Sequence, residues 1–241
     1  MEKKLTQNYH LRVTDYNLYD HITAYCILDL LQDVAGKHCD SYAMSYEELI
    51  NQNMAWVLVR TSFEILKPIK LHEVLKVTTW PRNKGLVDFD RETIMQDQSG
   101  DVVIKATSKW LIINYVTRRI IPAKHINYEA PCPDPSEYIY DHDAKKVSDF
   151  DITNCSLYQY KIEYNDLDHN GHVNNARYAY MLANAIKLKE NELIKSFSIN
   201  YVHESHLDDI INIYYLKDNK LYLVKGICDN QIIFIAELEL C

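Results

Sequence analysis

Apolar residues recur at helical spacing in two stretches of the chain, about 22–38 and about 174–188. Each stretch keeps an apolar stripe at intervals of four residues, formed by Ile22, Cys26, Leu30 and Val34 in the first and by Tyr178, Leu182 and Ile186 in the second. Residues spaced in this way lie on one face of a helix. The pattern therefore predicts two amphipathic helices.

Strand-like segments surround both predicted helices. A short extended segment precedes each helix, at 9–13 and 157–164. Four further segments follow each helix, at 56–65, 73–80, 87–95 and 102–114 in the first half and at 197–204, 210–216, 221–228 and 232–240 in the second. Asp97 to Gly100 is typical of a hairpin turn. This order predicts two similar units, each a helix wrapped by an antiparallel sheet, that pair edge to edge or face to face.

A proline-rich stretch separates the two halves. Pro131, Pro133 and Pro135 are followed by an acidic, tyrosine-rich sequence, and such composition is typical of a connection between units. We therefore predict an N-terminal unit over residues 1–130, a linker over 131–149 and a C-terminal unit over 150–241.

Composition excludes several function classes. Only 5 of the 241 residues are glycine, and no two lie close enough for a phosphate-binding loop or a dinucleotide-binding fingerprint. The formal net charge of -8 argues against a nucleic-acid partner. No apolar run approaches the ~20 residues of a membrane span. The 6 cysteines form no C-x-x-C pair, so we expect reduced thiols and a cytoplasmic protein.

The loop before the second helix concentrates chemistry-bearing side chains. Asp168, Asn170 and His172 are near neighbours there. A carboxylate can orient an imidazole, and an amide or a backbone N–H can hold a carbonyl oxygen. A cap with no catalytic role is the alternative for such an Asn- and Asp-rich loop. The loop before the first helix echoes this one, since Tyr19-Asp20-His21-Ile22-Thr23-Ala24 matches Asn170-Gly171-His172-Val173-Asn174-Asn175 in position.

The same loop carries a resemblance to a known family. From Asp166 to Tyr178 the chain reads D-L-D-x-N-x-H-V-N-N-x-x-Y, which resembles the signature of the plant and bacterial acyl-acyl-carrier-protein (acyl-ACP) thioesterases. Asn200 to Ser205 resembles the second active-site segment of that family, with Glu204 at its glutamate position and Ser205 where cysteine is frequent. The first half resembles the family at Tyr9–Val13, Leu30–Val34, Trp56–Thr61, Ala106–Trp110 and Thr117–Arg119.

Membership would imply an α+β double hot-dog fold and hydrolysis of fatty acyl-ACP to free fatty acid and holo-ACP, which ends fatty acid synthesis. No cofactor or metal is needed for this reaction. We expect Glu204, at the end of a strand, to activate water or attack directly. His172 would orient it and protonate the leaving thiolate, Asp168 would position His172, and Asn170 would bind the thioester oxygen. Ser205 implies that a thiol at that place is not required.

The acyl chain requires an apolar tunnel, for which Trp56, Leu58, Ile65 and Trp110 are candidates by position. The carrier protein is acidic, so it would need a local basic patch on this acidic chain. Candidate patches are Lys67 with Lys70, Arg82 with Lys84, Arg118 with Arg119, and Arg177 with Lys187 and Lys189.

Other interpretations remain open. An acyl-coenzyme A thioesterase would use the same catalytic residues. A hot-dog dehydratase or hydratase would act on a β-carbon instead of the thioester. A lipid-binding module would not need all four of Asp168, Asn170, His172 and Glu204. His169 with His172 and His203 with His206 suggest a zinc site, but residues three apart on a strand point to opposite faces, so no metal is expected. The chain could act as a monomer or a homodimer.

Overall fold

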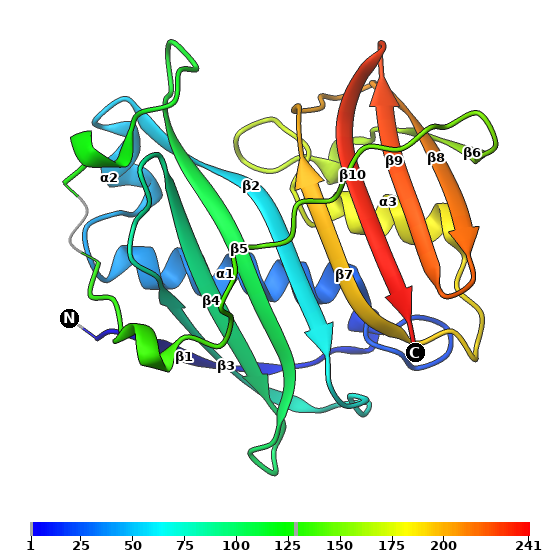
Figure 1. The fold of residues 1–241 in the computed structure, drawn as a ribbon, viewed down its shortest axis with the longest axis horizontal. Helices are drawn as coiled ribbons and strands as arrows, with labels where there is room; N and C mark the ends of the chain where they lie inside the picture. The colour runs from blue at the N-terminus through cyan, green and yellow to red at the C-terminus, as the bar shows by residue number, and fades with distance from the viewer. Residues whose placement is uncertain (1, 128–129) are drawn as a thin grey trace.

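One antiparallel sheet of ten strands wraps around two long helices in the computed structural model, which describes residues 2–127 and 130–241 (Figure 1). The strand order is β1-β3-β4-β5-β2-β7-β10-β9-β8-β6. In the first half the strands are β1 (Leu5–His10), β2 (Met54–Ile65), β3 (Val74–Pro81), β4 (Asp88–Gln96) and β5 (Val102–Asn114). In the second half they are β6 (Ser156–Lys161), β7 (Ile194–Tyr201), β8 (Ile210–Asp218), β9 (Leu221–Cys228) and β10 (Gln231–Leu240). The predicted α+β class and the predicted hairpin at Asp97–Gly100 are both confirmed.

The two halves join edge to edge through β2 and β7. These strands pair antiparallel, with Arg60 opposite Asn200 and Phe63 opposite Phe197. The two phenylalanine rings stack with centroids 5.4 Å apart. Since both rings are almost completely buried, the junction belongs to the hydrophobic core and the sheet is continuous across it.

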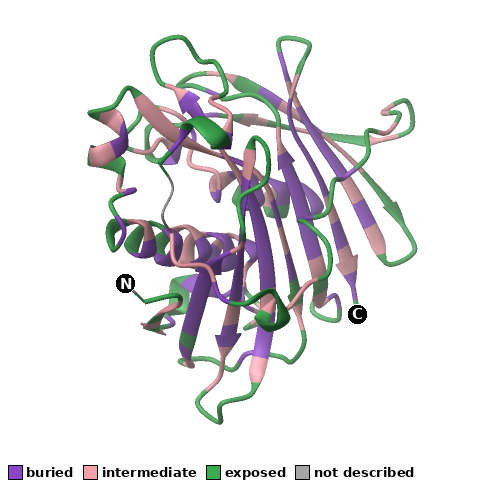
Figure 2. Ribbon diagram, turned by 60° about the vertical axis from the view of Figure 1, so that its left-hand side comes forward, coloured by how far each residue is buried: buried purple, intermediate pink, exposed green. Residues whose placement is uncertain are grey.

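The helices lie on one face of the sheet, where each buries its apolar stripe (Figures 1 and 2). They are α1 (Ala24–Asp40) and α3 (Arg177–Ile186), and a short α2 (Tyr46–Ile50) follows α1. Thr23 caps α1 by accepting a hydrogen bond from the N–H of Cys26 over 3.1 Å. One cluster of buried residues contains side chains of both α1 and α3, so the two halves share a core.

The helix α3 begins at Arg177, later than the predicted start at Asn174. Asn174 forms a turn instead: its Oδ1 accepts from the N–H of Ala176 over 2.9 Å, and its carbonyl accepts from the N–H of Arg177. Short asparagine side chains commonly compete with helical hydrogen bonds in this way. The turn separates the Asp168–His172 loop from the helix terminus.

The segment after β5 returns across the opposite face of the sheet (Figure 1). Glu92, which is 0% exposed, accepts hydrogen bonds from the N–H groups of Ile139 and Tyr140 over 2.9 and 3.1 Å. Asn200 donates to the carbonyl of Val147 over 2.7 Å and accepts from its N–H over 3.2 Å. The predicted linker is therefore a packed strap that covers buried polar groups.

The functional division into an acyl-binding unit over 1–130 and a catalytic unit over 150–241 stays a prediction. Residues 1 and 128–129, which the first unit includes, lie outside the described residues. No helix in the described ranges is long and apolar enough to cross a membrane.

Candidate active site

A short 3-10 turn, η4 (Tyr164–Asp166), sets the loop that carries the candidate residues. Asp166 is 4% exposed, and its carboxylate accepts from the N–H of Glu163 over 2.9 Å and from the Tyr160 hydroxyl over 3.1 Å. Its carbonyl accepts from the N–H of Asn174 over 3.0 Å. Asp166 therefore holds both ends of the loop and is a structural residue.

Asp168, Asn170 and His172 share one tight turn. The N–H of Asp168 donates to the carbonyl of His172 over 2.9 Å, and Gly171, with φ of 75°, supplies the left-handed conformation of the turn. The Asp168 carboxylate accepts from the backbone N–H of Asn170 over 2.8 Å and from its side-chain amide over 3.5 Å. In the described loop this carboxylate bonds Asn170 and not the imidazole, which corrects the expected role of Asp168 toward His172.

Glu204 approaches the loop from the other side. It does not end a strand as expected, because β7 stops at Tyr201. The segment beyond β7 is held by the N–H of Val202, which donates to Ile233, and by the carbonyl of Ser205, which accepts from Val173 over 3.0 Å. Glu204 Oε2 consequently lies 3.5 Å from Nε2 of His172. The structure thus brings together the two residues that the proposed chemistry needs.

Arg118 is a third member of this group, although sequence reasoning did not place it among the candidate catalytic residues. It has a φ of 58° in the loop after β5, where its N–H donates to the Asn114 carbonyl over 2.8 Å. Its guanidinium forms an ion pair with Oε2 of Glu204, the oxygen that also faces His172. No local signal links residues so far apart in the sequence; only the Thr117–Arg119 resemblance marked this position.

Histidines gather near the site without forming a metal centre. The rings of His172 and His206 meet edge to face with centroids 5.2 Å apart. His203 and His206 both follow β7 in a loop, so the argument from strand alternation was wrong. His203 Nδ1 instead lies 2.8 Å from the carbonyl of Ile232. Within residues 2–127 and 130–241, no group of three or more His, Cys, Asp or Glu could hold a metal ion.

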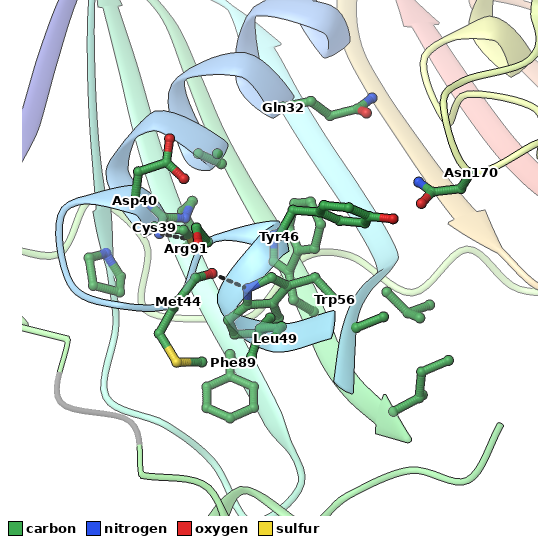
Figure 3. A pocket seen from close by; sticks show the side chains of 18 of the residues that line it. Gln32, Cys39, Asp40, Met44, Tyr46, Leu49, Trp56, Phe89, Arg91 and Asn170 are labelled. Atoms are coloured by element: carbon green, nitrogen blue, oxygen red, sulfur yellow. Dashed lines mark hydrogen bonds between the residues drawn. The ribbon is translucent and has the colours of Figure 1, made fainter. Parts of the chain in front are cut away.

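The group opens into a pocket of about 490 Å³ between α1, α2 and the first-half sheet, which we call the α1 pocket. Its polar end holds Asn170, His172, Glu204 and Arg118. Apolar side chains form much of the remaining lining, among them Met44, Leu49, Trp56 and Phe89 (Figure 3). Trp110 also lines the pocket. Of the residues expected to line a tunnel, Trp56 and Trp110 do so, whereas Leu58 is buried outside the lining. Ile65 lines a different pocket.

A hydrogen bond and ring packing orient the Trp56 side chain. Its indole N–H donates to the Met44 carbonyl over 3.2 Å. Its ring meets that of Phe89 edge to face at 5.1 Å. The apolar wall is therefore built from aromatic rings with defined orientations.

The far wall contains a buried polar cluster that sequence reasoning missed. The guanidinium of Arg91 lies 3.0 Å from Nδ1 of His38 and donates to the Tyr42 hydroxyl over 2.8 Å. Arg91 is 6% and His38 1% exposed. Burial and the nearby Arg91 charge lower the pKa of His38 to about 4, so its imidazole is neutral at pH 7.

Ser205 does not face the α1 pocket. Its side chain is 0% exposed and is absent from the pocket lining. It therefore makes a poor candidate nucleophile. The polar end of the pocket instead holds a carboxylate, an imidazole, an amide and a guanidinium. This set is suited to proton transfer and oxyanion binding beside an apolar chain.

Two family models match most of the chain. Residues 2–126 match the acyl-ACP thioesterase N-terminal domain, and residues 150–231 match the acyl-ACP thioesterase C-terminal domain. Oleoyl-acyl carrier protein thioesterase 2 of Arabidopsis thaliana is 28% identical over 203 residues, which cover 77% of this chain and 55% of that protein. The Coriandrum sativum oleoyl-acyl carrier protein thioesterase is 27% identical over 224 residues, covering 86% and 60%. The chain thus spans little more than half the length of these relatives.

Solved structures share the architecture. An acyl-ACP thioesterase from Bacteroides thetaiotaomicron superposes with a TM-score of 0.85 at 22% identity, covering 99% of this chain and 98% of that one. The 12:0-ACP thioesterase of Umbellularia californica superposes with a TM-score of 0.83 at 16% identity, covering 100% and 98%. The double hot-dog fold expected from the sequence is confirmed.

Proposed function

The chain belongs to the acyl-ACP thioesterase family, and on this basis we propose that it hydrolyses fatty acyl-acyl carrier protein to a free fatty acid and holo-acyl carrier protein. The observation that carries the proposal is the pairing of His172 with Glu204 at the polar end of the α1 pocket. A carboxylate and an imidazole in contact supply the base and the acid that thioester hydrolysis needs. The apolar wall beyond them suits an acyl chain.

Glu204 acts as the general base in this proposal. Its Oε2 faces His172 and Arg118, which leaves Oε1 to take a proton from water. The resulting hydroxide attacks the carbonyl carbon. When the C–S bond breaks, His172 gives a proton to the leaving thiolate and regains one from Glu204, so the proton balance closes over one turnover.

Asn170 holds the oxyanion. Its side-chain amide reaches the pocket, and the Asp168 carboxylate fixes the residue through the backbone N–H. A fixed donor stabilises the negative charge that develops on the thioester oxygen without reorganising during the reaction. Asp168 is therefore a positioning residue that acts through Asn170.

Arg118 marks the side from which the carrier protein would approach. It is 45% exposed at its side chain and lies on the rim of the α1 pocket, next to Arg119 in sequence. The carrier protein is acidic, and a cation at the rim suits that charge. Cytoplasmic location and the choice between monomer and homodimer stay predictions.

The test measures the release of free thiol from acyl-carrier-protein and acyl-coenzyme A thioesters of increasing acyl chain length. Wild type and Glu204→Ala are compared. Glu190→Ala, a change at an exposed carboxylate outside the α1 pocket, is the matched control. We expect faster release from the carrier protein, lost in Glu204→Ala and kept in the control. Faster release from coenzyme A would identify the other thioesterase class, and wild-type rates in Glu204→Ala would refute the assignment of the base.

A further inference from the structure

The loop before α1 repeats the conformation of the loop that carries His172. In the first loop the N–H of Asn17 donates to the carbonyl of His21 over 2.8 Å. In the second the N–H of Asp168 donates to the carbonyl of His172 over 2.9 Å. The first side chain of each turn also accepts a hydrogen bond from the backbone N–H two residues later. Asn17 accepts from Tyr19 over 2.9 Å, and Asp168 accepts from Asn170 over 2.8 Å.

The flanking positions repeat as well. The matching features are the isolated bridges Tyr16–Ile22 and Leu167–Val173, the positive φ of Asp20 and Gly171, and the 3.0 Å hydrogen bonds Thr23–Asp15 and Asn174–Asp166. The weak echo in the sequence therefore reflects a structural duplication in which His21 corresponds to His172.

The segments after β2 and β7 correspond in the same way. The N–H of Leu66 donates to Val103 over 2.8 Å, and the N–H of Val202 donates to Ile233 over 2.8 Å. Counting on from these two residues, Pro68 stands where Glu204 stands in the second half. Tyr19 likewise replaces Asn170. The duplicated site thus keeps its histidine but lacks the base and the amide, so it cannot hydrolyse a thioester by the proposed mechanism.

A pocket of about 920 Å³ adjoins this duplicated site, and we call it the α3 pocket. Its walls come from the His21 loop, the segment after β2 and α3, which correspond to the elements around the α1 pocket. Apolar side chains dominate the lining, among them Ile65, Ile69, Leu182, Ile186, Leu193 and Leu238. The volume falls within the usual range of ligand sites, roughly 300–1,000 Å³.

Charged side chains of both signs line the α3 pocket. Lys67 and Glu192 line it but pair with Asp101 and Lys217. Arg177 stacks on the Tyr25 ring at 5.1 Å and donates to the carbonyl of Asn165. Lys187, at the exposed end of α3, also lines the pocket. These two side chains are the cations that a bound carboxylate could reach, while Asp20 is an opposing acid on the rim.

We propose that the α3 pocket is a second, non-catalytic binding site for a long-chain fatty acid. The apolar walls take the hydrocarbon chain, and Arg177 with Lys187 face the carboxylate. The ligand class rests on the proposed function, because a duplicated acyl pocket would take the same chain and fatty acid is the product of that reaction. The existence of the site rests only on the duplication and the pocket.

The test counts molecules of the fluorescent fatty acid cis-parinaric acid bound per chain. Gln32→Trp fills the α1 pocket and Ala183→Trp fills the α3 pocket from the corresponding position of the other helix. Ala183 is exposed, so the larger side chain should not disturb the fold, and Ala183→Ser is the matched control. We expect two molecules in wild type and in Ala183→Ser, and one in each tryptophan variant.

One molecule in wild type, lost in Gln32→Trp and kept in Ala183→Trp, would overturn the proposal, as would no binding. A second variant, Lys187→Gln, should weaken the remaining site of Gln32→Trp several-fold for the acid but not for its methyl ester; equal effects on both would overturn the assigned carboxylate contact. Ala183→Trp should keep thioester hydrolysis, and its loss would contradict a non-catalytic site. If wild type bound two molecules but hydrolysed no thioester, the proposed function would be refuted and the second binding site would stand.

Discussion

Nε2 of His172 lies 3.5 Å from Oε2 of Glu204, although one residue belongs to the loop before α3 and the other to the segment after β7. Both side chains are partly exposed, at 27% and 41%, so their pairing contributes little to stability. An exposed pair at the polar end of an apolar pocket is better explained by chemistry than by folding.

Replacing His172 with alanine should lower kcat by roughly 100- to 10,000-fold, the usual contribution of an acid–base group. The melting temperature should change little. His206→Ala is the matched control, because that ring contacts His172 and not Glu204 in the described contacts. Steady-state kinetics with thermal melts would check this. Similar losses in both variants would show that ring packing, and not proton transfer, is what matters.

The pairing of Asp168 with Asn170 predicts a non-additive double mutant. Asn170→Ala should lower kcat by roughly 100- to 1,000-fold, as loss of an oxyanion donor does, and Asp168→Ala should lower it less. Because Asp168 acts through Asn170, adding Asp168→Ala to Asn170→Ala should change little. If the fold-losses in kcat of the two single variants multiply in the double variant, Asp168 would instead act separately on His172.

Arg118→Gln should raise KM for acyl-carrier-protein substrates several-fold and weaken the dependence of KM on salt. The reason is loss of a rim cation that attracts an acidic partner, an interaction that salt screens. Lys76→Gln, an exposed change outside the α1 pocket and outside the candidate basic patches, is the control. KM at low and high ionic strength would be measured for all three proteins. An unchanged salt response in Arg118→Gln would exclude the residue from docking.

His38 should make the protein less stable in acid. Its pKa is about 4 in the folded chain and about 6.5 in an unfolded one. Between these values only the unfolded chain binds the proton, so stability is complete above about pH 6.5 and falls as pH decreases toward 4, by up to about 3 kcal/mol. Urea unfolding of wild type and His38→Gln at several pH values checks this. If the free energy of unfolding fell equally with pH in the two proteins, His38 would not be the cause.

Sequence patterns predicted the parts of this protein that depend on neighbours along the chain. The apolar stripes located α1 and α3, and the strand-like segments located the sheet, because periodicity records which side of an element is buried. The loop from Asp166 to Asn174 was also readable, since its turn, its histidine and its amide lie within a few residues of one another. The family resemblance rested on the same local segments.

Relations between distant segments could not be read in this way. The edge-to-edge choice at β2 and β7, the approach of Arg118 to Glu204 and the buried contact of Arg91 with His38 all depend on how the sheet curves. A lone arginine looks the same in sequence whether it lies in solvent or beside a carboxylate.

The sequence by itself therefore determined the two-fold order of elements, the family and the four candidate residues Asp168, Asn170, His172 and Glu204. Only the tertiary structure decided that Asp168 bonds Asn170, that Leu58 lies outside the α1 pocket and that Pro68 stands where the duplicated site would need a carboxylate. The physical reason is that side-chain type and spacing record local backbone preference. The direction of a side chain and the neighbour that it meets arise from long-range packing.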